Sequence, residues 1–194
     1  MIGRAKAFRR VAAGKFFGFF WGKMSVLKNK RSLSRLEFYH HARKMRKEIT
    51  MLALRDFGIH SRGKRFKEET GSQQPEGFYD ELIAEFSKNV RLLLRNMMWN
   101  ITAGNTIYPV NEAELVERRL YQDRAIVACE QLHQEIMYCM DVMPVKTSAF
   151  APYIDQIEFE IKLLKGWRKA NSKIEALIAE RKAMREKEGL DNKQ

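Results

Sequence analysis

The 194-residue chain contains few residues that interrupt secondary structure. Four prolines and 11 glycines leave long stretches without a breaker, which favours a few long elements over many short strands. No apolar run approaches the roughly 20 residues that a membrane-spanning helix needs. The hydrophobic residues make up 45% of the chain and can supply the core of one domain of ordinary size. We therefore expect an all-α protein.

Cysteine is also scarce, with Cys129 and Cys139 as the only examples. Both fall in one predicted helix, where ten positions correspond to about 15 Å along the axis. This separation is too large for a disulfide. Two thiols kept apart in this way indicate a reducing compartment and a cytoplasmic protein.

Acidic residues are missing from the first 31 positions, which hold nine lysines and arginines. The whole chain has a formal net charge of +12. Such a protein attracts polyanions, because its cations release counterions from phosphates. Nucleic acid is the first candidate partner, and an anionic membrane surface is the second.

Residues 1–33 form a basic arm that contains the aromatic run "KFFGFFWGK". A secretory signal is not expected, because Lys15 and Lys23 bracket only seven residues, too few for its apolar core. Aromatics beside cations suit a membrane interface, so an interfacial anchor stays open. The alternatives are a disordered arm or an extension upstream of a start at Met24.

Apolar residues at steps of three and four predict four helices between residues 34 and 173. The first two span about 34–57 and 77–103, the third begins after Asn111 and stops before Pro144, and the fourth begins after Thr147 or Ser148. The expected apolar stripe of the second helix is Leu82, Phe86, Val90, Leu93, Met97 and Ile101.

Several residues predict where these helices begin and end. Ser34 with Glu37 and Asn111 with Glu114 have the spacing of capping boxes. Gly58 is expected to end the first helix, and Gly104, Asn105 and Pro109 to end the second. Pro152 fits only the first turn of the fourth.

Matched helix lengths and short connections predict an antiparallel up-and-down four-helix bundle over residues 34–173. The exception is the polar segment 58–76, which we expect to be a mobile connection. Residues 174–194 are charged and helix-favouring, and are predicted to be a protruding helix or a frayed tail.

No catalytic set is evident. His40 and His41 are adjacent, so on a helix they point about 100° apart and cannot share a metal. A di-metal bundle would need two Glu-x-x-His motifs, and only "EQLH" at 130–133 has that spacing. Cys129 lies on an apolar stripe, where a thiol acts as core filler. We therefore expect no enzyme, no cofactor and no metal.

Cations are better organised than any catalytic set. Residues 87–111 contain no acid at all, although Lys88, Arg91 and Arg95 follow one another there at helical spacing. The alternative is a solvated face without a ligand. The candidate nucleic-acid-binding residues are Arg43, Arg46, Lys47, Lys88, Arg91, Arg95, Arg118, Arg119, Arg124, Lys165, Arg168 and Lys169.

Trp167 precedes Arg168 in the stretch "LLKGWRK". A tryptophan beside an arginine suits base stacking combined with phosphate contact. Packing is favoured instead, because Trp167 lies three residues after Leu164 on the apolar stripe. Gly166 is expected to admit a neighbouring helix or to end the regular turn. The cations also suit the negative end of the helix dipole.

Four stretches together resemble one family: "LEFYHHARKMRKEI" (36–49), "NITAGNTIYPVNEAELVERRLYQDRAI" (100–126), "CEQLHQEIMYCMDVMPV" (129–145) and "IEFEIKLLKGWRKANSK" (157–173). They are similar to the accessory variability determinant (Avd) proteins, encoded beside the reverse transcriptase in diversity-generating retroelements of bacteria and phage. That family is related to four-helix-bundle proteins of ribosomal RNA intervening sequences. The resemblance covers about residues 34–173 and excludes the arm and the tail.

The resemblance implies a cytoplasmic homopentamer of four-helix bundles, from bacteria or phage, that binds the retroelement reverse transcriptase and its template RNA. The reverse transcriptase would hold the catalytic site for the mutagenic cDNA synthesis, with cDNA as a further ligand. The residues that fall within matching motifs are Arg118, Arg119, Gly166, Trp167, Arg168 and Lys169. The alternative function is a bundle adaptor for another protein, at a membrane surface through the arm.

Overall fold

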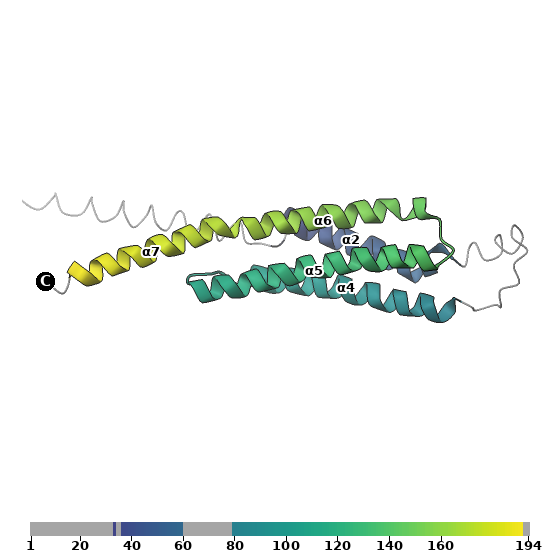
Figure 1. Cartoon of the computed structure of the whole chain (residues 1–194), viewed down its shortest axis with the longest axis horizontal. Coiled ribbons are helices and arrows are strands. Elements are labelled where there is room, and N and C mark those ends of the chain that lie inside the picture. Colours follow the sequence, from purple (N-terminus) through teal and green to yellow (C-terminus); the bar gives the residue numbers. More distant parts are fainter. Residues whose placement is uncertain (1–32, 34–35, 60–78, 192–194) are drawn as a thin grey trace, which may run out of the picture. The chain divides into compact units, whose positions relative to one another are not determined.

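A computed structural model describes residue 33 and the segments 36–59 and 79–191 (Figure 1). All regular structure in these segments is helical, which confirms the all-α prediction for this part of the chain. The long helices are α2 (Glu37–Leu54), α4 (Asp80–Thr106), α5 (Glu112–Val142), α6 (Ala151–Lys169) and α7 (Asn171–Asp191). The predictions for the aromatic arm, the connection 60–76 and the Ser34 cap lie outside the described residues.

Four of the helices pack around a shared core. α4 packs against α5 and α2, and α6 packs against the same two helices (Figure 1). The largest side chains that are completely enclosed come from all four, and include Met45, Phe86, Leu132 and Ile157. Burial of this apolar surface is the main stabilising contribution to such a fold.

The predicted start of α5 is confirmed. The Asn111 side chain accepts a hydrogen bond from the Glu114 backbone N–H at 2.9 Å. Glu114 in turn accepts one from the backbone N–H of Val110 at 2.7 Å. These two bonds satisfy N–H groups that have no partner inside the helix.

The first helix ends earlier than predicted. α2 stops at Leu54, and Asp56 and Phe57 then adopt left-handed conformations with φ of 52° and 54°. This turn buries Phe57, whose ring centroid lies 6.4 Å from that of Phe150. Gly58 therefore lies within the turn and does not cap α2, because burial of an aromatic ring outweighs continuation of the helix.

The predicted cap of the fourth helix is wrong as well. Residues Thr147–Ala149 form a separate 3-10 turn, η3, and Phe150 occupies the N-cap position of α6. Phe150 is buried, so packing and not side-chain capping fixes this start. Pro152 lies in the first turn, as predicted.

Two glycines have roles opposite to those expected. Gly104 does not end a helix, since α4 continues through it to Thr106. A Cβ at Gly104 would lie 3.0 Å from Trp167 Cη2 and 3.2 Å from Tyr121 Cβ, so this glycine permits close helix approach. Gly166 continues α6, and a Cβ there would meet no atom within 4 Å.

A polar contact marks the junction of α6 and α7, which only Ala170 separates. The buried Asn171 side chain donates to Gln122 Oε1, and Gln122 Nε2 donates to the Trp167 carbonyl oxygen at 3.5 Å. α7 then packs against α5, and Ile178 is buried. Residues 174–191, which were predicted to be either a protruding helix or a frayed tail, belong to this helix.

Candidate functional site

Two of the predicted cations in "LLKGWRK" are bound to acids on α5. Arg168 donates to both carboxylate oxygens of Asp123, at 2.8 and 3.3 Å. Lys165 contacts Glu130 at 2.9 Å. Exposed ion pairs add little stability, but each acid lowers the positive potential that its cation offers to a phosphate.

Arg118 and Arg119 are likewise held within the protein. Arg118 donates to the carbonyl oxygen of Ile107 at 3.0 Å, and its guanidinium carbon lies 5.7 Å from the centre of the Trp167 ring. Arg119 pairs with Glu175 of α7 at 2.5 Å. Both arginines connect elements of the fold, which is a structural role.

The other eight predicted cations are all exposed, and none has an acid within ion-pair distance among the residues that the structure describes. Arg43 and Arg124 lie against tyrosine rings of their own helices. The eight are Arg43, Arg46, Lys47, Lys88, Arg91, Arg95, Arg124 and Lys169.

Exposed apolar side chains lie among the cations of α4. Lys88, Leu92, Arg95 and Trp99 follow steps of four, three and four, and therefore share one side of the helix. All four are exposed, with Trp99 at 72% and Leu92 at 42%. We call these four residues the α4 outer stripe.

Arg91 does not belong to this stripe, although the sequence predicted one ridge with Lys88 and Arg95. Its Nε donates to the Ser87 carbonyl oxygen at 2.9 Å. The side chain lines a groove that Leu54 and Asp56 also line, on the side of α4 that faces α2. The structure thus places two of the three cations together and turns the third toward α2.

The two tryptophans of the described helices, Trp99 and Trp167, differ in exposure. Trp167 is only 9% exposed, and its ring stacks on Phe38 with centroids 4.6 Å apart. Packing is therefore confirmed for Trp167. Trp99 is exposed, and the sequence signal for this is its position four residues after Arg95 and outside the stripe of Met97 and Ile101.

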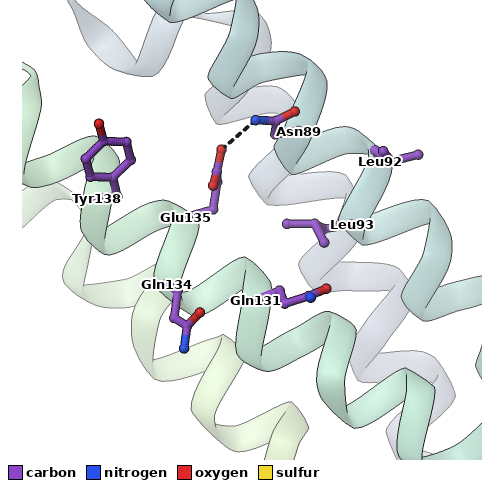
Figure 2. Close-up of a pocket in the computed structure, with 7 residues that line it drawn as sticks. All are labelled: Asn89, Leu92, Leu93, Gln131, Gln134, Glu135 and Tyr138. Carbon is purple, nitrogen blue, oxygen red and sulfur yellow. Dashed lines mark hydrogen bonds between the residues drawn. The ribbon is translucent and has the colours of Figure 1, made fainter.

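A shallow groove between α4 and α5 borders the α4 outer stripe (Figure 2). Asn89 Nδ2 donates to Glu135 Oε1 across it, at 2.9 Å. Tyr138, Gln131 and Gln134 line the α5 side, as Figure 2 shows. The groove thus presents the Glu135 carboxylate together with amide and phenol groups, and Leu92 is the residue that it shares with the α4 outer stripe.

Apolar side chains also lie on the outer side of α5. Val116, Leu120 and Val127 are each about half exposed or more, and Arg124 lies among them along the sequence. Exposed apolar side chains that gather on one element are typical of a surface that contacts another macromolecule. The α4 outer stripe and these α5 residues are the two candidate surfaces.

The core also contains an acid and a histidine in contact. Glu160 has no exposed surface, and its Oε2 lies 2.7 Å from Nδ1 of His41. Burial raises the pKa of Glu160 to about 8 and lowers the pKa of His41. Because Glu160 is inaccessible, this pair affects stability and offers no substrate site.

The two cysteines are predicted to be unreactive in the folded protein. Burial raises the pKa of Cys129 and raises that of Cys139 to about 12, so almost no thiolate exists at pH 8. We expect a thiol reagent at pH 8 to label neither cysteine within minutes under native conditions and both in denaturant. Rapid native labelling of either thiol would contradict this burial.

The described segments contain no group of three His, Cys, Asp or Glu side chains arranged to hold a metal ion. Their helices also lack any apolar stretch of the length required to cross a bilayer.

Comparison with protein-family models, with characterised proteins and with solved structures found no match for the chain. The resemblance to Avd proteins therefore stays a prediction. The ligand of the α4 and α5 surfaces has to be argued from charge, exposure and spacing.

Proposed function

We propose that the protein is a non-catalytic, nucleic-acid-binding accessory subunit of a retroelement reverse transcriptase, which helps to bind template RNA during mutagenic cDNA synthesis. One observation carries the nucleic-acid part: Lys88 and Arg95 are exposed on α4, within 25 consecutive residues, 87–111, that contain no acid. The reverse transcriptase, the homopentameric assembly and the cytoplasmic location in bacteria or phage rest on the resemblance.

We also infer an antiparallel up-and-down four-helix bundle. A bond from Ser87 Oγ to the Ala53 carbonyl oxygen, 3.0 Å long, joins the start of α4 to the end of α2. Asn89 and Glu135 join the start of α4 to the later part of α5. His41, near the start of α2, meets Glu160 in the middle of α6, whereas Glu48, later in α2, contacts Gln156, earlier in α6. Each of these contacts supports opposite directions for the two helices that it joins.

The α4 cations should contribute more to the free energy of binding a polyanion than the α6 cations do. Cations without acid partners can replace the counterions condensed on a phosphate backbone, and the release of those ions favours binding. Lys165 and Arg168 would first have to give up Glu130 and Asp123. We therefore assign the main electrostatic contribution to α4.

Neutralising the α4 cations is expected to weaken RNA binding strongly. The variant Lys88→Gln, Arg91→Gln, Arg95→Gln should bind a structured RNA about 10- to 100-fold more weakly, with a salt slope reduced by about two units. Filter binding or fluorescence anisotropy between 50 and 200 mM salt measures both quantities.

The matched control removes the same charge from α6, in Lys162→Gln, Lys165→Gln, Arg168→Gln. Each of these cations lies within 4 Å of an acid, so we expect a change of no more than a few fold. An equal loss of RNA affinity in the two variants would mean that the net charge of the protein alone governs binding. Salt-independent RNA affinity in the unaltered chain would refute the proposal itself.

A protein-interaction adaptor is the second candidate function. The exposed Val116, Leu120 and Val127 of α5 favour it, because three apolar side chains around one cation, Arg124, suit a protein partner better than a phosphate backbone. RNA affinity that depends neither on salt nor on the α4 cations would support this alternative.

A further inference from the structure

Trp99 has the greatest exposed fraction, 72%, among the exposed large apolar side chains of the described residues. The helix cannot rotate to bury it, because Met97, Met98 and Ile101 already occupy the core side of α4. α4 is also held by α2 and α5 on its two flanks. The indole is thus fixed on a supported helix with most of its surface open to solvent.

The neighbours of Trp99 on the α4 outer stripe are suited to a nucleotide. Arg95 lies one helical turn before Trp99, about 6 Å along the axis, and Lys88 lies about 10 Å before Arg95. Arginine and lysine bind phosphate, and an exposed indole offers a flat surface on which a base can stack. In a nucleotide the phosphate and the base are likewise separate groups that project from one sugar.

The positive charge of the α4 outer stripe argues against self-association, in which the stripe of a second copy of the chain would cover it. A two-fold contact through this stripe would place Lys88 and Arg95 of one chain against the same residues of the other. No acid between residues 87 and 111 is available to offset that repulsion, and like charges opposed in an interface cost several kcal/mol. A polyanion is attracted by the same charges.

A base can stack on Trp99 only if its face is accessible. In a continuous duplex each base face is covered by its neighbours, whereas loops, bulges and single strands present unstacked bases. We infer that the α4 outer stripe binds an unpaired nucleotide of RNA or DNA, with the base stacked on Trp99 and the backbone phosphates contacted by Lys88 and Arg95. This inference rests on the proposed nucleic-acid function and adds the class of ligand.

The test compares single-stranded and duplex probes on the full chain. We expect Trp99→Ala to bind a single-stranded 12-mer of uridines about 10- to 100-fold more weakly and a blunt RNA duplex unchanged. Trp99→Phe, which keeps an aromatic face, should stay within a few fold of the unaltered chain. Single-strand binding should quench tryptophan emission in the unaltered chain and not in Trp99→Phe.

Phe159→Ala is the matched control, because Phe159 is also an exposed aromatic residue but lies on α6. It should leave single-strand affinity unchanged. Circular dichroism checks that each variant keeps its helices.

The outcomes separate this inference from the proposed function. If Trp99→Ala binds the single strand normally while neutralised α4 cations weaken RNA binding, the stacking role is wrong and the proposed function stands. If the unaltered chain binds no RNA, both fail. If Trp99→Ala changes the oligomeric state in sedimentation velocity, a second copy covers this residue and the stacking inference is overturned.

Discussion

Gly104→Ala is expected to lower the free energy of unfolding by about 1 to 3 kcal/mol. The added methyl group would lie 3.0 Å from the Trp167 ring and 3.2 Å from Tyr121 Cβ. Tyr121 Cβ is fixed to the α5 backbone, and the Trp167 ring is confined by Phe38 on one face. Neither neighbour can move without disturbing other contacts. Denaturant unfolding followed by circular dichroism measures the change, and the larger Gly104→Val should destabilise further.

Gly166→Ala is the matched control, and its expected effect has the opposite sign. Gly166 is exposed within α6, and an added Cβ meets no atom within 4 Å. Alanine at an exposed helix position is favoured over glycine by about 0.5 to 1 kcal/mol. If Gly104→Ala stabilised the protein as much as Gly166→Ala, close packing of α4 against Tyr121 and Trp167 would be disproved.

The second large effect is a loss of stability between pH 6.5 and about 8. The buried Glu160 has its pKa raised from 4.5 to about 8, so across that range the folded protein holds a proton that the unfolded chain has released. Stability from this group is therefore lost as pH rises. The pKa of His41 is lowered from 6.5, so its contribution to stability is lost as pH falls below that value.

The two opposite slopes offset each other below pH 6.5, and only the Glu160 effect remains above it. Other groups act weakly on the pair: Lys44, Glu48 and Glu37 influence His41 from α2. Cys129 of α5, which also interacts with Glu160, stays protonated here because its own pKa is raised. A single proton changes stability by at most about 1.4 kcal/mol per pH unit, so we expect a loss of about 1 to 2 kcal/mol.

Glu160→Gln should abolish this pH dependence. The amide keeps a hydrogen bond to His41 Nδ1 but cannot ionise. The free energy of unfolding of this variant should therefore stay constant from pH 6.5 to 8. Glu158→Gln is the control, since Glu158 is exposed on the same helix and contacts Lys162 at 3.9 Å. A pH profile of Glu160→Gln that matches the unaltered chain would assign the titration to another group.

Spacing along the chain predicted the four helices that the structure shows between residues 37 and 169, but it left the segment of α7 open between a helix and a frayed tail. Phe86, Val90, Met97 and Ile101 were expected to be buried on α4, and they are. The prediction erred at the margins of the stripe, where Leu82 and Leu93 are half-buried while Ile83 and Leu94 are enclosed. The spacing of apolar residues alone predicts which side of a helix is buried. The width of that buried side depends on which neighbouring helices pack against it.

The candidate site could be predicted only in part, because the sequence locates cations but not the acids that meet them. Arg168 and Asp123 are 45 positions apart, and their pairing depends on the contact between α6 and α5. The acid-free segment 87–111 is visible in the sequence, whereas the outward position of Trp99 beside Arg95 depends on which sides of α4 meet α2 and α5.

By itself, the sequence determined the helical class, the start of α5 at Asn111 and the excess of positive charge, because these depend on residues close together in the chain or on composition. Only the tertiary structure decided that Trp99 is exposed, which glycine admits a neighbouring helix and which of the predicted cations stay without acid partners among the described residues. Each of these depends on side chains brought together from helices far apart in sequence, and no local pattern encodes that proximity.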